Sequence, residues 1–181
     1  MGKIKTDWYG RKGGCMNIIL IGMRGSGKST IGKLLAKKLD KQFYDMDSLL
    51  EKKVRMTLPE YVKQLGWESF RDKESEVAEE VSHLTNVIIA TGGGVILREK
   101  NINALKTNGK FIFLKTSIIQ MLNRIGDAKN RPSLTKRNTL EEELEEIWKQ
   151  RKSLYEQTAD ITIETDDKTT DEITKEIIKQ L

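Results

Sequence analysis

The 181-residue chain has only one cysteine, one histidine and two prolines, and it has no long apolar run. Because Cys15 has no second cysteine to pair with, an internal disulfide is excluded, and the chain lacks partners for a cysteine-based zinc site. This use of cysteine is typical of a reducing compartment, so we expect a cytoplasmic protein. No apolar stretch approaches the roughly 20 residues of a membrane-spanning helix, and we expect no membrane partner.

Residues 1–15 lack the apolar segment of a secretory signal, and we expect them to form a flexible extension. The remaining length suits one α/β domain over residues 16–181, and we expect a monomer. The formal net charge of +5 reflects 32 Lys+Arg against 27 Asp+Glu and suits an anionic ligand. This mild excess, which is spread along the chain, suits nucleic acid equally well, but we expect no nucleic-acid partner.

Short apolar runs alternate with amphipathic stretches along the chain, which predicts a parallel sheet covered by helices on both faces. Strands are expected at residues 17–21, 42–44, 87–90, 110–114 and 159–163. Helices are expected for about three turns after Thr30 and over residues 118–125, 140–155 and 173–181, with a helical hairpin over residues 49–84 that is broken at Pro59 and Gly66.

Residues 22–29 read GMRGSGKS and match G-x-x-x-x-G-K-[ST] between a predicted strand and a predicted helix. In such a phosphate loop, backbone N–H groups converge on phosphate oxygens at a helix N-terminus. Lys28 would reach the β and γ phosphates, and the Ser29 hydroxyl would ligate magnesium. The motif alone does not choose among kinases, GTPases and ATPases. The missing Asn-Lys-x-Asp element and the short chain favour a nucleotide or metabolite kinase.

Arg71, Glu74 and Arg151 interrupt the apolar stripes of two predicted helices. Buried charge is costly unless it is paired or used, and Arg71 and Glu74 stand three residues apart, where they can pair. One interpretation is a guanidinium clamp for an anionic substrate, with Arg71 steered by Glu74. The alternative for Arg71 is an arginine at the edge of the stripe that reaches solvent.

Asp45 and Asp47 follow a short strand, at the edge of the sheet where ligands of α/β proteins bind. One could hold magnesium while the other accepts a proton from a substrate hydroxyl, or Asp47 could simply cap a helix. The triplet Gly92, Gly93 and Gly94 exposes backbone amides to a ligand. Residues 126–138 are basic and fit either a lid over nucleotide phosphates or a solvated loop.

Taken together, these features resemble the shikimate kinases in identity and order from residue 16 to residue 181. The resemblance rests on GMRGSGKST, the DMD pair, Phe70-Arg71, the GGG triplet, Arg131-Pro132 and Arg151-x-x-x-Tyr155. It implies a phosphate-loop NTPase fold with three α/β/α layers and a five-stranded parallel sheet. It also implies a substrate-binding helical region at about residues 48–76 and a mobile lid at about residues 126–138.

The activity that the resemblance implies is transfer of the ATP γ-phosphoryl group to the 3-hydroxyl of shikimate, a step toward chorismate and the aromatic amino acids. Lys28, Asp47 and Arg131 would be catalytic, and Ser29 and Asp45 would serve Mg²⁺. The residues implied in binding shikimate are Asp47, Arg71, Glu74, Gly92, Gly93, Gly94 and Arg151. The residues implied in binding the nucleotide are Gly25, Ser26, Gly27, Lys28, Ser29, Thr30, Arg124, which would stack on adenine, and Arg131.

Two rival functions remain open at this point. A kinase for another small hydroxy acid, such as gluconate, would keep the nucleotide half of the site and change the acceptor half. A non-catalytic nucleotide-binding regulator would tolerate the loss of Asp47, and a nucleic-acid binder would lose affinity steeply with salt. Two departures from the family pattern are the N-terminal extension and the absence of a proline at residues 166–169, beside the expected adenine.

Overall fold

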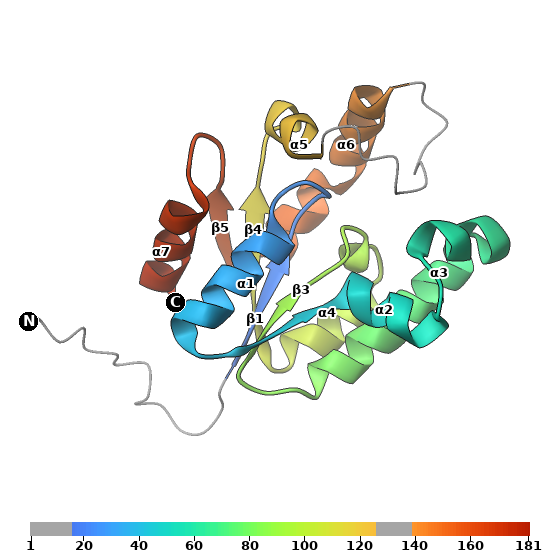
Figure 1. The fold of residues 1–181 in the computed structure, drawn as a ribbon, viewed down its shortest axis with the longest axis horizontal. Coiled ribbons are helices and arrows are strands. Elements are labelled where there is room, and N and C mark those ends of the chain that lie inside the picture. Colours follow the sequence, from blue (N-terminus) through green and yellow to red (C-terminus); the bar gives the residue numbers. More distant parts are fainter. Residues whose placement is uncertain (1–15, 126–138) are drawn as a thin grey trace, which may run out of the picture.

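The computed structural model describes residues 16–125 and 139–181. These residues form a five-stranded parallel sheet in the order β2-β3-β1-β4-β5 (Figure 1), which confirms the predicted α/β class. The strands are β1 (Asn17–Ile21), β2 (Gln42–Asp45), β3 (Val87–Ala90), β4 (Gly109–Lys115) and β5 (Ile161–Glu164). The expected extension at residues 1–15 and the expected lid at residues 126–138 lie outside the described residues.

Helices connect and cover the strands (Figure 1). They are α1 (Lys28–Leu39), α2 (Met46–Val54), α3 (Leu58–Ser82), α4 (Glu99–Lys106), α5 (Ile118–Ile125), α6 (Leu140–Thr158) and α7 (Thr170–Gln180), with a 3₁₀ turn η2 (Val95–Leu97). Neither α4 nor η2 was predicted from the sequence. The predicted β5 began two residues too early, and the predicted α7 began three residues too late, because Thr169 caps that helix through Glu172.

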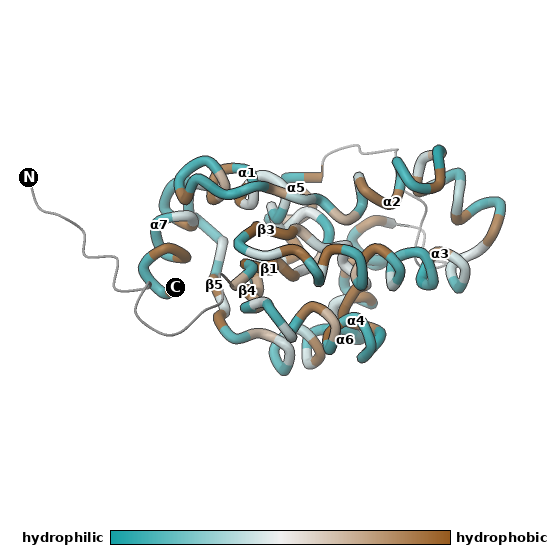
Figure 2. The backbone as a smooth tube through the Cα atoms, turned by 90° about the horizontal axis from the view of Figure 1, so that it is seen from below, coloured by the Kyte–Doolittle hydropathy of each residue, from teal (hydrophilic) through white to brown (hydrophobic). Residues whose placement is uncertain are grey.

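Alternating side chains of the central strands supply two hydrophobic cores. In β1, Ile18 and Leu20 join the core beneath α1 and α7, whereas Ile19 and Ile21 join the core beneath α3, α4 and α6. Figure 2 shows the apolar strands between α1 and α7 on one side and α4 and α6 on the other. Since burying one such side chain stabilises the fold by roughly 1.5–3 kcal/mol, the paired cores hold the sheet rigid beneath its loops.

The predicted helical hairpin is present, but its first break does not fall at Pro59. The chain leaves α2 at Arg55, whose φ is 56°, and α3 begins under a capping box in which Thr57 and Glu60 satisfy each other's backbone N–H groups. Pro59 lies in the first turn of α3, where its missing N–H costs nothing. The second predicted break is confirmed, because Gly66 (φ 78°) kinks α3.

The carboxyl ends of β1, β2 and β3 carry the loops in which the sequence analysis placed the site. β1 runs into the phosphate loop (residues 22–29), β2 ends at Asp45, and β3 runs into the glycine triplet. Because parallel strands present their carboxyl ends at one edge of a sheet, these segments meet there. In the described part of the chain, no helix is both long enough and apolar enough to cross a membrane.

Candidate active site

The phosphate loop wraps around the amino group of Lys28. Its Nζ donates to the carbonyls of Gly22 and Met23, at 2.8 Å each, and contacts Ser26 Oγ at 3.4 Å. The loop turns at Gly25 (φ 78°) and Gly27 (φ 93°), and Gly27 caps α1. The positive end of the α1 dipole and the Lys28 ammonium group therefore face the same space, which suits a phosphate chain.

Asp45 links the phosphate loop to α2. Ser29 Oγ donates to Asp45 Oδ2 at 2.5 Å, while Asp45 Oδ1 accepts from the backbone N–H groups of Asp47 and Ser48 at 3.1 and 3.3 Å. Asp45 is thus the N-cap of α2, and the alternative that Asp47 caps this helix is wrong. Asp47 lies in the first turn of α2, where its carboxylate is not needed for capping.

A groove of about 1800 Å³ lies over the phosphate loop, and we call it the phosphate-loop groove. Arg124 of α5 borders it and donates to the carbonyl of Thr165 at 3.0 Å and to that of Ser26 at 3.4 Å. Every nucleotide-binding residue predicted within the described chain lines the groove, whereas Arg131 lies outside the described residues. Further lining residues that the sequence analysis did not assign to the nucleotide include Arg24, Thr91, Lys168, Thr169, Thr170 and Ile173.

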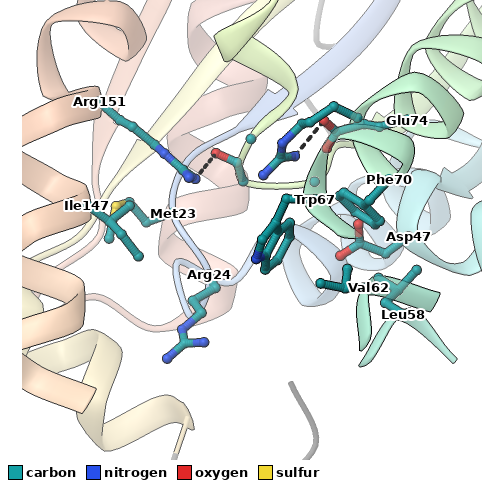
Figure 3. Close-up of a pocket in the computed structure, with 14 residues that line it drawn as sticks. Met23, Arg24, Asp47, Leu58, Val62, Trp67, Phe70, Glu74, Ile147 and Arg151 are labelled. Atoms are coloured by element: carbon teal, nitrogen blue, oxygen red, sulfur yellow. Dashed lines mark hydrogen bonds and ion pairs between the residues drawn. The ribbon is translucent and has the colours of Figure 1, made fainter. Parts of the chain in front are cut away.

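A second, smaller cavity of about 600 Å³ adjoins the groove, and we call it the arginine pocket (Figure 3). It contains all seven residues that the sequence analysis assigned to the substrate: Asp47, Arg71, Glu74, Gly92, Gly93, Gly94 and Arg151. Its apolar wall was not predicted, because a hydrophobic residue that lines a pocket follows the same periodicity as one in the core. The wall consists of Met23, Leu58, Val62, Trp67, Phe70 and Ile147.

Arg71 and Glu74 form an ion pair inside this pocket, as their spacing predicted. Arg71 Nη1 lies 2.6 Å from Glu74 Oε2, and the guanidinium carbon is 5.0 Å from the centroid of the Phe70 ring. Burial raises the pKa of Glu74, and the charge of Arg71 opposes that rise. A Cβ atom at Gly94 would lie 2.2 Å from Arg71 Nη1, so the glycine triplet lets the guanidinium approach the loop.

Arg151 and Tyr155, both in α6, donate hydrogen bonds to the backbone of the glycine triplet. The Gly93 carbonyl accepts from Arg151 Nη1 at 3.0 Å (Figure 3). The same carbonyl accepts from the Tyr155 hydroxyl at 2.5 Å. Burial lowers the pKa of Arg151, and it raises the pKa of Tyr155 to about 12. Arg151, which interrupts the second apolar stripe, therefore also lines the pocket. The contact by which Tyr155 holds the loop was not predicted from the sequence.

Three residues, Arg24, Asp47 and Gly93, line both the groove and the arginine pocket. A ligand in the pocket can therefore meet the terminal phosphate of a nucleotide bound in the groove. Such an arrangement permits direct transfer between two bound molecules, since it holds both reactants in one geometry. Asp47 is the carboxylate at this junction.

The shikimate kinase family profile matches residues 24–181 of this chain. A shikimate kinase of Legionella pneumophila is 41% identical over 165 residues, which cover 91% of this chain and 94% of the relative. The solved shikimate kinase of Acinetobacter baumannii in complex with shikimate is similar at a TM-score of 0.87 and 34% identity, over 91% of this chain and 92% of that one.

A gluconokinase of Sinorhizobium meliloti is similar in fold alone, with a TM-score of 0.59 and 15% identity over 93% of this chain and 92% of that one. The Legionella relative therefore matches this chain in sequence, the Acinetobacter kinase matches it in both sequence and structure, and the gluconokinase matches it only in structure. The expected fold and family are confirmed. This chain belongs to the shikimate kinase family.

Proposed function

We propose that this chain transfers the γ-phosphoryl group of ATP to the 3-hydroxyl of shikimate and releases ADP and shikimate 3-phosphate. One observation carries the proposal: the arginine pocket, with two largely buried guanidinium groups, opens onto the phosphate-loop groove at Asp47. Guanidinium groups suit a carboxylate, and a glycine-rich loop at a helix N-terminus suits phosphates. Membership of the family supports shikimate as the molecule that brings the carboxylate and ATP as the one that brings the phosphates.

In this proposal the acceptor's carboxylate binds Arg71 and Arg151. Glu74 is the positioning residue for Arg71, because their contact of 2.6 Å fixes the guanidinium in the pocket. Backbone groups of residues 92–94 approach the acceptor's ring and hydroxyls. The apolar wall excludes water from the bound ring, which strengthens the charged contacts around it.

Asp47 is proposed to bind the reacting hydroxyl and accept its proton as the phosphoryl group is transferred. Its position at the junction supports this role, as does its freedom from capping α2, which is the task of Asp45. Phosphoryl transfer asks little covalent chemistry of the protein, and its rate depends on in-line positioning and on cationic stabilisation. Lys28 supplies one positive charge in the groove, and the proposed role of Arg131 rests on the resemblance alone.

The nucleotide is proposed to bind across residues 25–30, with its adenine against Arg124. Ser29 and Asp45 are the residues that would hold Mg²⁺, because both offer the hard oxygen atoms that this ion prefers and their hydrogen bond of 2.5 Å brings the two side chains together. Mg²⁺ prefers one or two such ligands together with phosphate oxygens and water. When bound, the ion would neutralise charge on the β and γ phosphates.

The partners in this proposal are two small molecules, and a monomeric kinase domain over residues 16–181 suffices to hold both. The substrate-binding region at residues 48–76 and the lid at residues 126–138 belong to the proposal. A cytoplasmic location is proposed as well, supported by the single cysteine.

Measuring ADP release from MgATP with shikimate, with gluconate and with no acceptor tests the assignment. We expect release to depend on shikimate. A gluconate-dependent release would identify the rival hydroxy-acid kinase, and release without any acceptor would remove shikimate from the account while leaving the nucleotide site in place.

A further inference from the structure

Arg24 occupies one of the unspecified positions of the phosphate loop, so the loop motif does not require an arginine there. It lines both the groove and the arginine pocket. Figure 3 shows Arg24 and Glu74 on opposite sides of the drawn residues, with Arg24 on the side of the phosphate loop. Arg24 therefore adds a third guanidinium to the pocket, at a distance from the Arg71–Glu74 pair.

An ion pair holds the Arg24 side chain in place. Arg24 Nη2 lies 3.1 Å from Glu143 Oε1, and the two side chains are 14% and 6% exposed. Glu143 lies in the first turn of α6, the helix that also carries Arg151. Taking two charges out of water is costly, and a buried pair is best explained where it fixes a charge at a defined place. The pair connects the phosphate loop to α6 beside the junction of the two cavities.

The chemistry of that junction suits a guanidinium that contacts the transferred group. Phosphate oxygens accept the parallel N–H bonds that an arginine offers, and the planar guanidinium holds its five N–H donors in a fixed geometry. Shikimate has no phosphate, whereas the product has one at the hydroxyl that faces the groove. A cation at the junction therefore favours the phosphorylated form over the unphosphorylated one.

We propose that Arg24, positioned by Glu143, binds the phosphoryl group of the phosphorylated acceptor where the pocket joins the groove. This inference rests on the proposed function. It divides the three arginines of the pocket by task, since Arg71 and Arg151 bind the carboxylate and Arg24 binds the phosphoryl group.

Calorimetric titration of the full chain with shikimate and with shikimate 3-phosphate tests this division. Removing Arg24 alone takes the positive charge from its buried ion pair with Glu143, so the main variant is the neutral pair Arg24→Met/Glu143→Gln. We expect its affinity for shikimate 3-phosphate to fall about tenfold or more, the loss typical of hydrogen bonds to a charged group. The affinity for shikimate should change by less than about threefold, because its carboxylate contacts lie elsewhere.

The matched control is Lys38→Met, which removes one positive charge from an ion pair with Asp171 between α1 and α7, outside both cavities. It should leave both affinities unchanged. Equal losses for the two ligands in the main variant would show a change of pocket shape and overturn the inference, and so would an unchanged affinity for the product. If the unaltered chain binds neither ligand, the proposed function fails and the inference fails with it.

The role of Glu143 has its own readout. Glu143 is proposed to act through Arg24. Glu143→Gln introduced alone should therefore lower the affinity for shikimate 3-phosphate, whereas the same substitution should cause no further loss in the Arg24→Met variant. A further loss in that background would show that Glu143 acts independently. Melting temperatures of all variants establish that each one is folded at the temperature of titration.

Discussion

Asp45 and Asp47 lie two positions apart, and the fold gives them different tasks. Asp45 accepts from two backbone N–H groups at the start of α2 and from Ser29 Oγ, whereas Asp47 lies at the junction of the two cavities. The pair was found from the sequence, which left open whether Asp47 caps the helix. That question depends on where α2 begins, which residue spacing does not determine.

Asp47→Asn tests the proton-accepting role at the residue scale. The substitution keeps the size of the side chain and leaves the cap of α2 intact, so the melting temperature should change little. We expect kcat to fall about 100-fold or more, the usual contribution of a positioned general base. The measurement is steady-state phosphoryl transfer at saturating ATP and shikimate, and full activity in this variant would remove Asp47 from the mechanism.

Arg71→Ala tests the carboxylate clamp. A lost hydrogen bond to a charged group costs about 1.5–3 kcal/mol, so we expect the KM for shikimate to rise about tenfold to a hundredfold. The KM for ATP should stay within about threefold, because Arg71 lines the arginine pocket and does not line the phosphate-loop groove. An equal rise in both constants would contradict the division of the site into two halves.

At the scale of elements, the loop after β3 and the kink in α3 use glycine for different reasons. Gly94 has an ordinary φ of −107°, but a Cβ atom there would lie 2.2 Å from Arg71 Nη1. Gly66 has a φ of +78°, and a Cβ atom there would meet nothing within 4 Å. Gly94 is therefore required by a close approach, and Gly66 is required by its backbone conformation.

Alanine at Gly94 should therefore affect chiefly the binding of shikimate, whereas alanine at Gly66 should affect chiefly the stability of the fold. Gly94→Ala should raise the KM for shikimate by displacing Arg71, with only a small loss of stability. Gly66→Ala should lower the free energy of unfolding by about 1–3 kcal/mol, the cost of a backbone conformation (φ 78°, ψ 170°) that essentially only glycine adopts, with little change in that KM. Urea unfolding and steady-state kinetics on both variants give the comparison, and a reversed pattern would refute it.

Elements with strong local signals could be predicted, and those held by distant contacts could not. The phosphate loop has fixed spacing between a strand and a helix, so it was found in full. The missed helix α4 has few apolar positions, and its N-cap, Arg98, makes no side-chain capping bond. The contact of Tyr155 with Gly93 joins residues 62 positions apart, and no pattern along the chain indicates it.

At the scale of the whole molecule, Tyr155 joins α6 to the loop after β3. Its titration makes the stability of the fold depend on pH in the alkaline range. Its folded pKa of about 12 exceeds the ordinary value of 10.0 because burial disfavours the phenolate. The contribution of protonated Tyr155 to the free energy of unfolding is therefore complete below about pH 10 and is lost as the pH rises toward 12.

Tyr155→Phe should remove that dependence. We expect a loss of about 1 kcal/mol at neutral pH, because one buried hydrogen bond is gone. Between pH 10 and 12, the difference in melting temperature between the unaltered chain and the variant should shrink, since the titrating group is absent from the variant. A difference that stays constant across this range would show that Tyr155 does not titrate as described.

The whole molecule brings two predicted halves of a site to one edge of a parallel sheet. The family resemblance predicted a set of site residues, but the sequence could not show that the groove and the pocket meet at Arg24, Asp47 and Gly93. That meeting depends on the strand order, which places β3 beside β1. Phosphoryl transfer from a nucleotide in the groove to the 3-hydroxyl of shikimate in the pocket is the central claim that follows from it.

The most direct test of that claim is to identify the product. The chain is incubated with MgATP and shikimate, and the acceptor is analysed by mass and by phosphorus–proton NMR correlation, with Lys28→Met as the inactive control. We expect a single phosphomonoester, coupled to the proton at carbon 3 of shikimate and formed in step with ADP. A phosphate on another hydroxyl, or ADP without a phosphorylated acceptor, would contradict the account.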